Sequence, residues 1–170
     1  KDPEAILAVL PADHVIRPAA KFREAVLEAA AVAGLGEIVT FGIPAREPRT
    51  GYGYIQRGQA LDHPGSLAGY RVEAFKEKPD RKTAEGYVAA GGYYWNSGMF
   101  VWSAETVLSG LRAHQPAVAE AVAKIVDAWE TPKQEAVLAE AYGAAEKISI
   151  DYALLEHADS VAVLEAEFDW

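Results

Sequence analysis

The sequence contains no cysteine among its 170 residues. This absence excludes a disulfide framework, a zinc–cysteine site, a thiol nucleophile and an iron–sulfur cluster. The four histidines, His14, His63, His114 and His157, lie far apart, and none has the spacing of a metal-ligand pair on one helix. No apolar run approaches the length needed to span a membrane, so we expect a cytoplasmic protein without a membrane partner.

Positive charge is scarce as well. Lysine and arginine number 16 against 25 aspartate and glutamate residues, which gives a net charge of -9. An acidic surface argues against a dedicated DNA or RNA binder. It does not exclude phosphate ligands, because a few local cations and backbone amides can hold a phosphate on an acidic protein. With 51% hydrophobic residues in the chain, we expect a single globular domain over residues 1–170.

Predicted strands and helices alternate along the chain. Residues 5–10 form a continuous apolar run, which is typical of a strand buried on both faces of a parallel sheet. A helix with Pro18 in its first turn follows, and residues 37–43 read as the next strand, which makes a βαβ unit. Further strands are expected at 54–57, 70–75, 99–102 and 160–164, and further helices at 82–90, 104–112, 116–129, 150–157 and after Thr131. The alternation predicts an α/β fold with a mixed sheet.

Asp13 follows the first predicted strand, within the segment Leu-Pro-Ala-Asp-His. Ligands of parallel α/β folds bind at the carboxyl ends of strands, and Asp13 leaves the sheet at such an end. A carboxylate there can hold Mg²⁺, a hard cation that takes few protein ligands and keeps waters and phosphates for the rest. Alternatively Asp13 caps the following turn, and spacing alone slightly favours this second interpretation.

Two further segments carry glycine or charge. Thr-Gly-Tyr-Gly-Tyr at 50–54 allows close backbone approach to a ligand, but serves equally well in a tight turn. Phe-Lys-Glu-Lys-Pro-Asp at 75–80 places an acid between two cations at the end of a strand. A lysine there can contact a phosphate, and the acid can accept hydrogen bonds from sugar hydroxyls. The alternative is a solvated charge cluster.

Asn96 is the only asparagine in the chain and lies among aromatic residues and a glycine, in the segment 93–100. Its amide both donates and accepts hydrogen bonds, which suits a sugar hydroxyl. The alternative is a turn that joins the aromatic segment to a core strand. No segment is decisive alone.

The order and spacing of the segments together are specific. They run Leu-Pro-Ala-Asp-His, Thr-Gly-Tyr-Gly-Tyr-Ile, Glu-Lys-Pro-Asp, Trp-Asn-Ser-Gly-Met-Phe and Ser-Ile-Asp-Tyr-Ala. This series resembles the mannose-1-phosphate guanylyltransferases, which make GDP-mannose and pyrophosphate from GTP and mannose 1-phosphate. The resemblance implies a Rossmann-like three-layer α/β/α sandwich with a mixed, mostly parallel sheet, of the nucleotide-diphospho-sugar transferase type.

The resemblance also implies roles for individual residues. Asp13 matches the family's ligand for Mg²⁺, and Lys78 matches the lysine that faces the sugar phosphate. Gly53 matches a glycine that lines the sugar pocket, while Glu77 and Asn96 match residues that reach the sugar. The reaction implied is in-line attack of the mannose 1-phosphate oxygen on the α-phosphorus of GTP. Catalysis would consist of positioning and of charge neutralisation by Mg²⁺ and the lysine.

The sequence departs from the family pattern in several places. The family's glycine-rich loop, which binds the nucleotide triphosphate, has no match in the chain, and neither has its guanine-reading segment. A second metal-binding aspartate follows a tryptophan that aligns with Trp170, and Asp169 precedes that tryptophan, so the role is not transferred to it. We therefore expect an incomplete fold, a central fragment that holds most of the sugar half of a site and is inactive alone.

Other functions stay open at this point. The chain fits a non-catalytic sugar-phosphate-binding or regulatory relative, and also a nucleotidyltransferase for another sugar 1-phosphate or base. The partners expected are GTP and mannose 1-phosphate, with no nucleic acid. A homo-oligomer is compatible with the sequence, which does not determine the oligomeric state.

Overall fold

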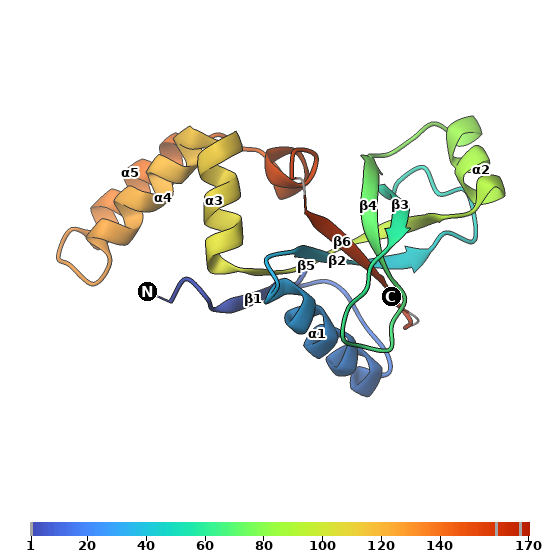
Figure 1. The fold of residues 1–170 in the computed structure, drawn as a ribbon. Coiled ribbons are helices and arrows are strands. Elements are labelled where there is room, and N and C mark those ends of the chain that lie inside the picture. The colour runs from blue at the N-terminus through green and yellow to red at the C-terminus, as the bar shows by residue number, and fades with distance from the viewer. Residues whose placement is uncertain (1, 159, 167) are drawn as a thin grey trace. The chain divides into compact units, whose positions relative to one another are not determined.

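The computed structural model describes residues 2–158, 160–166 and 168–170 (Figure 1). The strands are β1 (Ile6–Val9), β2 (Ile38–Pro44), β3 (Tyr54–Ala60), β4 (Gly69–Lys76), β5 (Tyr93–Ser103) and β6 (Val161–Glu165). The helices are α1 (Ala19–Ala33), α2 (Arg81–Ala90), α3 (Ala104–His114), α4 (Pro116–Ala128) and α5 (Gln134–Ala144), followed by a π-helical turn, η1 (Asp151–Leu155). The α/β class predicted from the sequence is confirmed. In the described part of the chain, no helix is both long and apolar enough to cross a membrane.

The chain divides into two compact units. The first comprises residues 1–106 and 159–170 and contains the sheet together with α1 and α2. The second comprises residues 107–158 and contains most of α3 together with α4, α5 and η1. Whether the two units form the single domain expected from the sequence stays a prediction.

β5 organises the sheet of the first unit. It pairs antiparallel with β2 along one edge, and along its other edge with β3 near its start and with β1 near its end. β2 and β6 form the one parallel pair among the described strands, and β4 joins β6 to β3. The sheet is mixed, as predicted. Contrary to what the resemblance implied, the sheet is not mostly parallel, because β3, β4 and β5 each run antiparallel to the described strands beside them.

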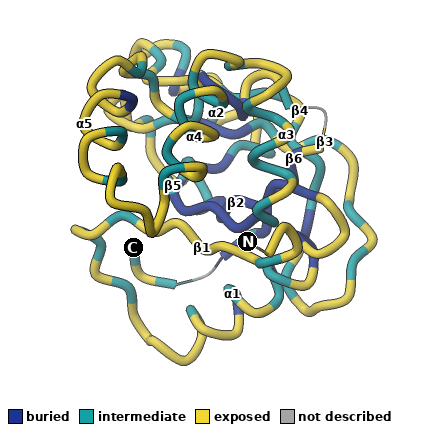
Figure 2. The backbone as a smooth tube through the Cα atoms, turned by 90° about the vertical axis from the view of Figure 1, so that its left-hand side faces the viewer, coloured by how far each residue is buried: buried dark blue, intermediate teal, exposed yellow. Residues whose placement is uncertain are grey.

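The main core lies between this sheet and α1. Alternate residues of β2, Val39 and Phe41, face the helix together with Met99 and Val101 of β5. The buried face of α1 is formed largely by alanine, whose small side chain lets the helix lie close to the strands. In Figure 2 the buried stretch follows β2 through the interior, while much of α1 is exposed.

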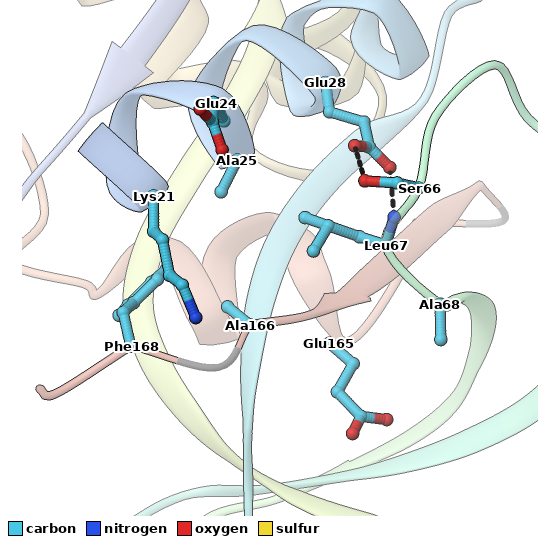
Figure 3. Close-up of a pocket in the computed structure, with 10 residues that line it drawn as sticks. All are labelled: Lys21, Glu24, Ala25, Glu28, Ser66, Leu67, Ala68, Glu165, Ala166 and Phe168. Carbon is cyan, nitrogen blue, oxygen red and sulfur yellow. Dashed lines mark hydrogen bonds between the residues drawn. The ribbon is translucent and has the colours of Figure 1, made fainter. Parts of the chain in front are cut away.

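The loop between β3 and β4 is fastened to α1 through Glu28. Leu67 N donates a hydrogen bond to Glu28 Oε1 (2.7 Å), and Ser66 Oγ donates to Glu28 Oε2 (3.5 Å), as Figure 3 shows. The residues drawn there line a cavity of about 340 Å³ beside α1. These hydrogen bonds hold the β3–β4 loop, which leads into the start of β4, against α1.

β1 corrects one expectation from the sequence. Its apolar run was expected to be buried on both faces, but all four residues of the strand are exposed, with Leu7 43% and Val9 45% accessible. The physical reason is its place in the sheet. β1 pairs with β5 alone and is an edge strand, so its apolar side chains are not enclosed between neighbours.

Candidate functional site

Three of the five predicted site residues meet where β3, β4 and β5 come together. Tyr54, the first residue of β3, is paired with β4 on one side and with β5 on the other. The residues next along these strands are Gly53, Glu77 and Asn96, which we call the three-strand junction. Asn96 N donates a hydrogen bond to Gly53 O (2.8 Å). Antiparallel pairing thus brings together residues that are far apart in the sequence.

Gly53 leaves no room for a side chain at the three-strand junction. A Cβ built on it would lie 2.6 Å from Glu77 Oε2 and 3.5 Å from Asn96 Cβ. Gly51, two residues earlier, has no atom within 4 Å of the same position. The two glycines therefore differ: a side chain at Gly53 would displace the Glu77 carboxylate, whereas a side chain at Gly51 would meet no atom.

Glu77 and Lys78 form an ion pair at the end of β4. Lys78 Nζ lies 3.0 Å from Glu77 Oε1, and the Lys78 and Glu77 side chains are 65% and 32% exposed. Lys78 has a φ of 42°, in the left-handed region that residues with a Cβ rarely adopt. This conformation turns the chain sharply after β4. It presents an ammonium group and a carboxylate side by side on an accessible surface, rather than as separately solvated charges.

Asn96 lies inside a long strand, not in a turn as the alternative interpretation had it. Its Oδ1 accepts hydrogen bonds from Gly98 N (3.1 Å) and from Thr40 Oγ1 (3.4 Å). Thr40 is fully buried, and its single hydroxyl proton is shared between Asn96 Oδ1 and the nearer Met99 O (3.0 Å). The hydrogen bonds from Gly98 and Thr40 fix the orientation of the Asn96 amide. Sequence reasoning missed Thr40, although a lone polar residue in the apolar strand 38–43 was a usable signal.

Asp13 lies in a turn after β1, exposed to solvent. Neither interpretation of Asp13, as a ligand for Mg²⁺ or as the cap of a turn, is decided by its position in this turn. Pro11, two residues before Asp13, lies beside Gly98 of β5. A Cβ built on Gly98 would lie 3.8 Å from Pro11 Cγ.

A row of aromatic rings continues from His14 toward β5. Trp170 Nε1 donates a hydrogen bond to His14 Nδ1 (2.9 Å), and the two rings meet edge to face. Tyr52 then contacts both Trp170 and Trp95, each with ring centroids 5.4 Å apart. The row thus runs from His14, next to Asp13, to the Trp95 side chain of β5. No sequence pattern indicated the row, since the rings come from four separate segments.

The donor set for a metal is a single carboxylate. No group of three or more histidine, cysteine, aspartate or glutamate side chains in the described part of the chain could hold a metal ion. Mg²⁺ is usually held by one or two carboxylates and completes its shell with waters and substrate phosphates. The exposed, unpartnered Asp13 fits that mode of binding, in which most ligands come with the substrate.

Tyr94 links β5 to β6 behind the three-strand junction. Its hydroxyl donates to Glu165 Oε2 (2.6 Å) and accepts from Arg57 Nη1 (3.2 Å). Burial, with the hydrogen bond to Glu165 as a second cause, raises the pKa of the Tyr94 phenol well above its usual range. The hydrogen bond from Arg57 raises the pKa of that guanidinium. Tyr94 therefore stays protonated and braces β5 next to Trp95 and Asn96.

The fifth motif of the sequence pattern, residues 149–153, lies in the second unit. It forms the start of η1, in which Ala153, Leu154 and Leu155 are buried. Within the motif itself Ala153 is buried, whereas Tyr152 is 47% exposed.

The arrangement suits recognition of a phosphorylated polyol. The three-strand junction offers a carboxylate that accepts and an amide that donates, and Lys78 beside it offers an ammonium group for an anion. The site holds no histidine and no activated nucleophile among the described residues, so it is built for positioning and charge neutralisation and not for proton transfer.

Comparisons of this chain with known proteins identify a family that it matches. A family model described as "Nucleotidyl transferase" matches residues 1–145. The chain is 46% identical over 171 residues to the xanthan biosynthesis protein XanB of Xanthomonas campestris pv. campestris (strain B100). It is 39% identical over 168 residues to a mannose-1-phosphate guanylyltransferase of Escherichia coli (strain K12). Each alignment covers 98% of this chain and 35% of the relative, so the chain spans about a third of their length.

Solved structures agree with the fold. The crystal structure of a mannose-1-phosphate geranyltransferase from Thermus thermophilus is 35% identical, with a TM-score of 0.82, covering 97% of this chain and 45% of that one. A mannose-6-phosphate isomerase from Helicobacter pylori is 28% identical, with a TM-score of 0.79, covering 100% of this chain and 66% of that one. Both similarities extend over both compact units.

Proposed function

The chain belongs to the nucleotidyl transferase family, and we propose that the protein it forms, alone or within a longer chain, joins GTP and mannose 1-phosphate into GDP-mannose and pyrophosphate. The observation that carries this proposal is the three-strand junction. Gly53, Glu77 and Asn96 meet there with Lys78 beside them, in a set that suits a sugar phosphate. Relatives named for mannose-1-phosphate guanylyltransferase activity, and for xanthan and alginate biosynthesis, support it, and suggest a role in making a polysaccharide precursor.

Each side chain has a separate task in this proposal. Glu77 accepts hydrogen bonds from sugar hydroxyls, and Asn96, held by Thr40, meets another polar group of the sugar. Lys78 lies beside the sugar phosphate and offsets its charge as the phosphate oxygen attacks the α-phosphorus of GTP. Gly53 has no side chain that would occupy the space proposed for the sugar. Positioning of two bound reactants is the main source of rate, because little proton chemistry is needed.

Asp13 would hold Mg²⁺, which supplies charge neutralisation on the triphosphate. Its exposed position after β1, next to His14 of the aromatic row, supports this assignment. The cytoplasmic location expected from the sequence also stays a prediction.

The test is GDP-mannose formation by the protein that carries this chain, supplied with GTP, mannose 1-phosphate and Mg²⁺. We expect Lys78→Ala to lower kcat, because a cation that faces phosphate charge is lost. We expect Glu77→Ala mainly to raise KM for mannose 1-phosphate, since loss of a charged hydrogen bond costs roughly 1–3 kcal/mol. Lys82→Ala, an exposed cation on α2, is the matched control. Product formation that is unaffected by both site variants would refute the assignment.

The same assay separates the alternatives. A non-catalytic relative binds mannose 1-phosphate in a manner sensitive to Glu77→Ala but forms no GDP-mannose. An enzyme for another sugar or base shows a higher kcat/KM with that substrate than with mannose 1-phosphate and GTP.

A further inference from the structure

The loop between β1 and α1 is fastened to the chain that follows β6. Arg17 N donates a hydrogen bond to Asp169 O (3.2 Å), and Asp169 N donates to Arg17 O (2.9 Å), so the two residues form an isolated antiparallel bridge. Three residues before Arg17, His14 Nδ1 accepts a hydrogen bond from Trp170 Nε1 (2.9 Å). We call these three hydrogen bonds the loop clasp. They lie within the first unit.

The side-chain bond of the loop clasp has a fixed direction. An indole N–H only donates, so His14 Nδ1 is the acceptor and carries no proton while this bond is made. The rings of His14 and Trp170 also meet edge to face, with centroids 5.3 Å apart. Both side chains are half-buried. The hydrogen bond and the ring contact together restrict the orientation of His14.

The other side of the loop clasp is anchored in the main core. Phe168 contacts Phe22 of α1 and Phe41 of β2 edge to face, with ring centroids 5.6 Å and 6.2 Å apart. Phe168 and Trp170 both pack against the main core. Residues 168–170 are therefore held by packing, and through the loop clasp they restrict the loop after β1. Such restriction lowers the conformational entropy of that loop before any ligand binds.

Asp13 is the residue that this restriction affects most directly. It immediately precedes His14 and lies exposed in the turn after β1. An exposed carboxylate loses conformational freedom when it binds a cation, and a backbone that is already held in place lowers that cost. The proposed reaction assigns no task to His14 or to Trp170.

We propose that His14 is a positioning residue for Asp13, and that it acts through the hydrogen bond it accepts from Trp170. The loop clasp holds the turn that carries Asp13, so that its carboxylate is ordered before a divalent cation binds. His14 itself contacts neither cation nor substrate. This inference rests on the proposed function, in which Asp13 holds Mg²⁺, and it adds the residues on which that task depends.

The test is Mn²⁺ binding to the protein that carries this chain, followed by the electron paramagnetic resonance signal of the free ion. Mn²⁺ is the probe because carboxylate and water ligands suit it as they suit Mg²⁺. Asp13→Asn identifies the share of binding that depends on this carboxylate. For that share we expect His14→Leu, which removes the acceptor, to raise the Kd about fivefold, which corresponds to ~1 kcal/mol. His14→Asn retains an acceptor and should restore most of the affinity.

A double-mutant cycle shows whether His14 acts through Trp170. Trp170→Phe keeps an aromatic ring but removes the donor, so we expect it to weaken Mn²⁺ binding as much as His14→Leu does. Because both substitutions break the same hydrogen bond, the double variant should bind no more weakly than either single variant. His114→Leu and Trp129→Phe, at exposed side chains of the second unit, are the matched controls and should leave binding unchanged.

Steady-state kinetics separates positioning from a general structural role. In His14→Leu the Mg²⁺ concentration that gives half the maximal rate should rise, while KM for mannose 1-phosphate stays at the parent value. An equal rise in that KM would show a wider loss of structure and overturn the inference. Parent-like Mn²⁺ binding in His14→Leu, or additive losses in the double variant, would overturn it while leaving the proposed function intact. Unchanged Mn²⁺ binding in Asp13→Asn would refute the metal assignment of the proposed function, and this inference with it.

Discussion

Gly53 is the single residue whose change reports most directly on the packing of the three-strand junction. In Gly53→Ala the new methyl group would lie 2.6 Å from Glu77 Oε2, so the Glu77 carboxylate must move away from its position beside Lys78. We expect kcat/KM for mannose 1-phosphate to fall by the equivalent of roughly 1–3 kcal/mol, the value of a charged hydrogen bond. Steady-state kinetics of GDP-mannose formation measures this.

Gly51→Ala is the matched control for that substitution. It adds the same methyl group two residues away, where nothing lies within 4 Å. We expect its kinetics to match those of the parent. Equal losses in the two variants would mean that the loop before β3 matters for its flexibility and not for its approach to Glu77.

Tyr94 gives a prediction about pH. Its pKa is raised in the folded protein by burial and by its hydrogen bond to Glu165, so the folded state retains the phenolic proton at a pH where the unfolded state loses it. The stabilisation is therefore fully present below the unfolded pKa of about 10, and is lost as pH rises above it. Tyr94→Phe should lower the free energy of unfolding at pH 7 by roughly 1–3 kcal/mol, because Glu165 loses its donor.

Denaturant unfolding at pH 7 and at a pH above 10 measures this effect. The difference between parent and Tyr94→Phe should shrink at the higher pH. Tyr142→Phe, at a side chain that is 77% exposed, should differ little from the parent at either pH. A Tyr94→Phe difference that stays constant across this range would contradict the account of the Tyr94 proton.

At the scale of elements, two glycines should respond to alanine in opposite directions. Gly86 lies in α2 with nothing within 4 Å, and alanine is favoured over glycine in a helix by roughly 0.5–1 kcal/mol. Gly42 lies in β2, where a Cβ would be 2.6 Å from Val163 Cγ2 and 2.8 Å from Tyr94 Cβ. Both neighbours are buried and cannot yield easily, so Gly42→Ala should separate β2 from β5 and β6.

Thermal unfolding of the two variants tests this pair. We expect the Tm of Gly86→Ala to rise and that of Gly42→Ala to fall. A rise in both would show that β2 tolerates displacement, and that the packing around Phe41 is looser than the structure indicates.

Elements were predictable from the sequence where local chemistry decides them. A serine before a helix is a typical cap, and Ser103 Oγ, before α3, accepts a hydrogen bond from Thr106 N (3.0 Å). The residues at which β4 and β6 begin and end were predicted closely from the apolar pattern and the turn residues around it. The extension of β5 back to Tyr93 was missed, because Gly98 and Asn96 read as turn residues. Pairing with β2 and β3 keeps that segment extended.

The site itself was not predictable from local chemistry. The segments around Gly53, Glu77 and Asn96 each had an ordinary structural interpretation, and only strand pairing across long separations brings them together. The roles of these residues came from family resemblance. The structure adds that three of these residues, Gly53, Glu77 and Asn96, lie close together. The exposure of β1 was missed because burial depends on which elements cover a strand, and an apolar run does not record that.

At the scale of the whole molecule, the exposed apolar edge at β1 should promote association. An edge strand with free backbone groups and exposed Ile6, Leu7 and Val9 is a template for pairing with another chain. We expect the chain to self-associate with rising concentration in sedimentation velocity, and Leu7→Lys to reduce this. Val126→Lys, at an exposed apolar side chain of α4, is the control. A chain that stays monomeric, or an equal effect of both variants, would contradict the prediction.

The central claim is that Gly53, Glu77, Lys78 and Asn96 form a pocket for mannose 1-phosphate. The most direct measurement is a titration of the isotope-labelled chain with mannose 1-phosphate, followed by the shifts of its backbone amide signals in two-dimensional NMR. The account predicts that the largest shifts occur at these four residues and that they disappear in Glu77→Ala while persisting in Gly51→Ala. Shifts confined to other parts of the chain, or shifts that persist unchanged in Glu77→Ala, would contradict it.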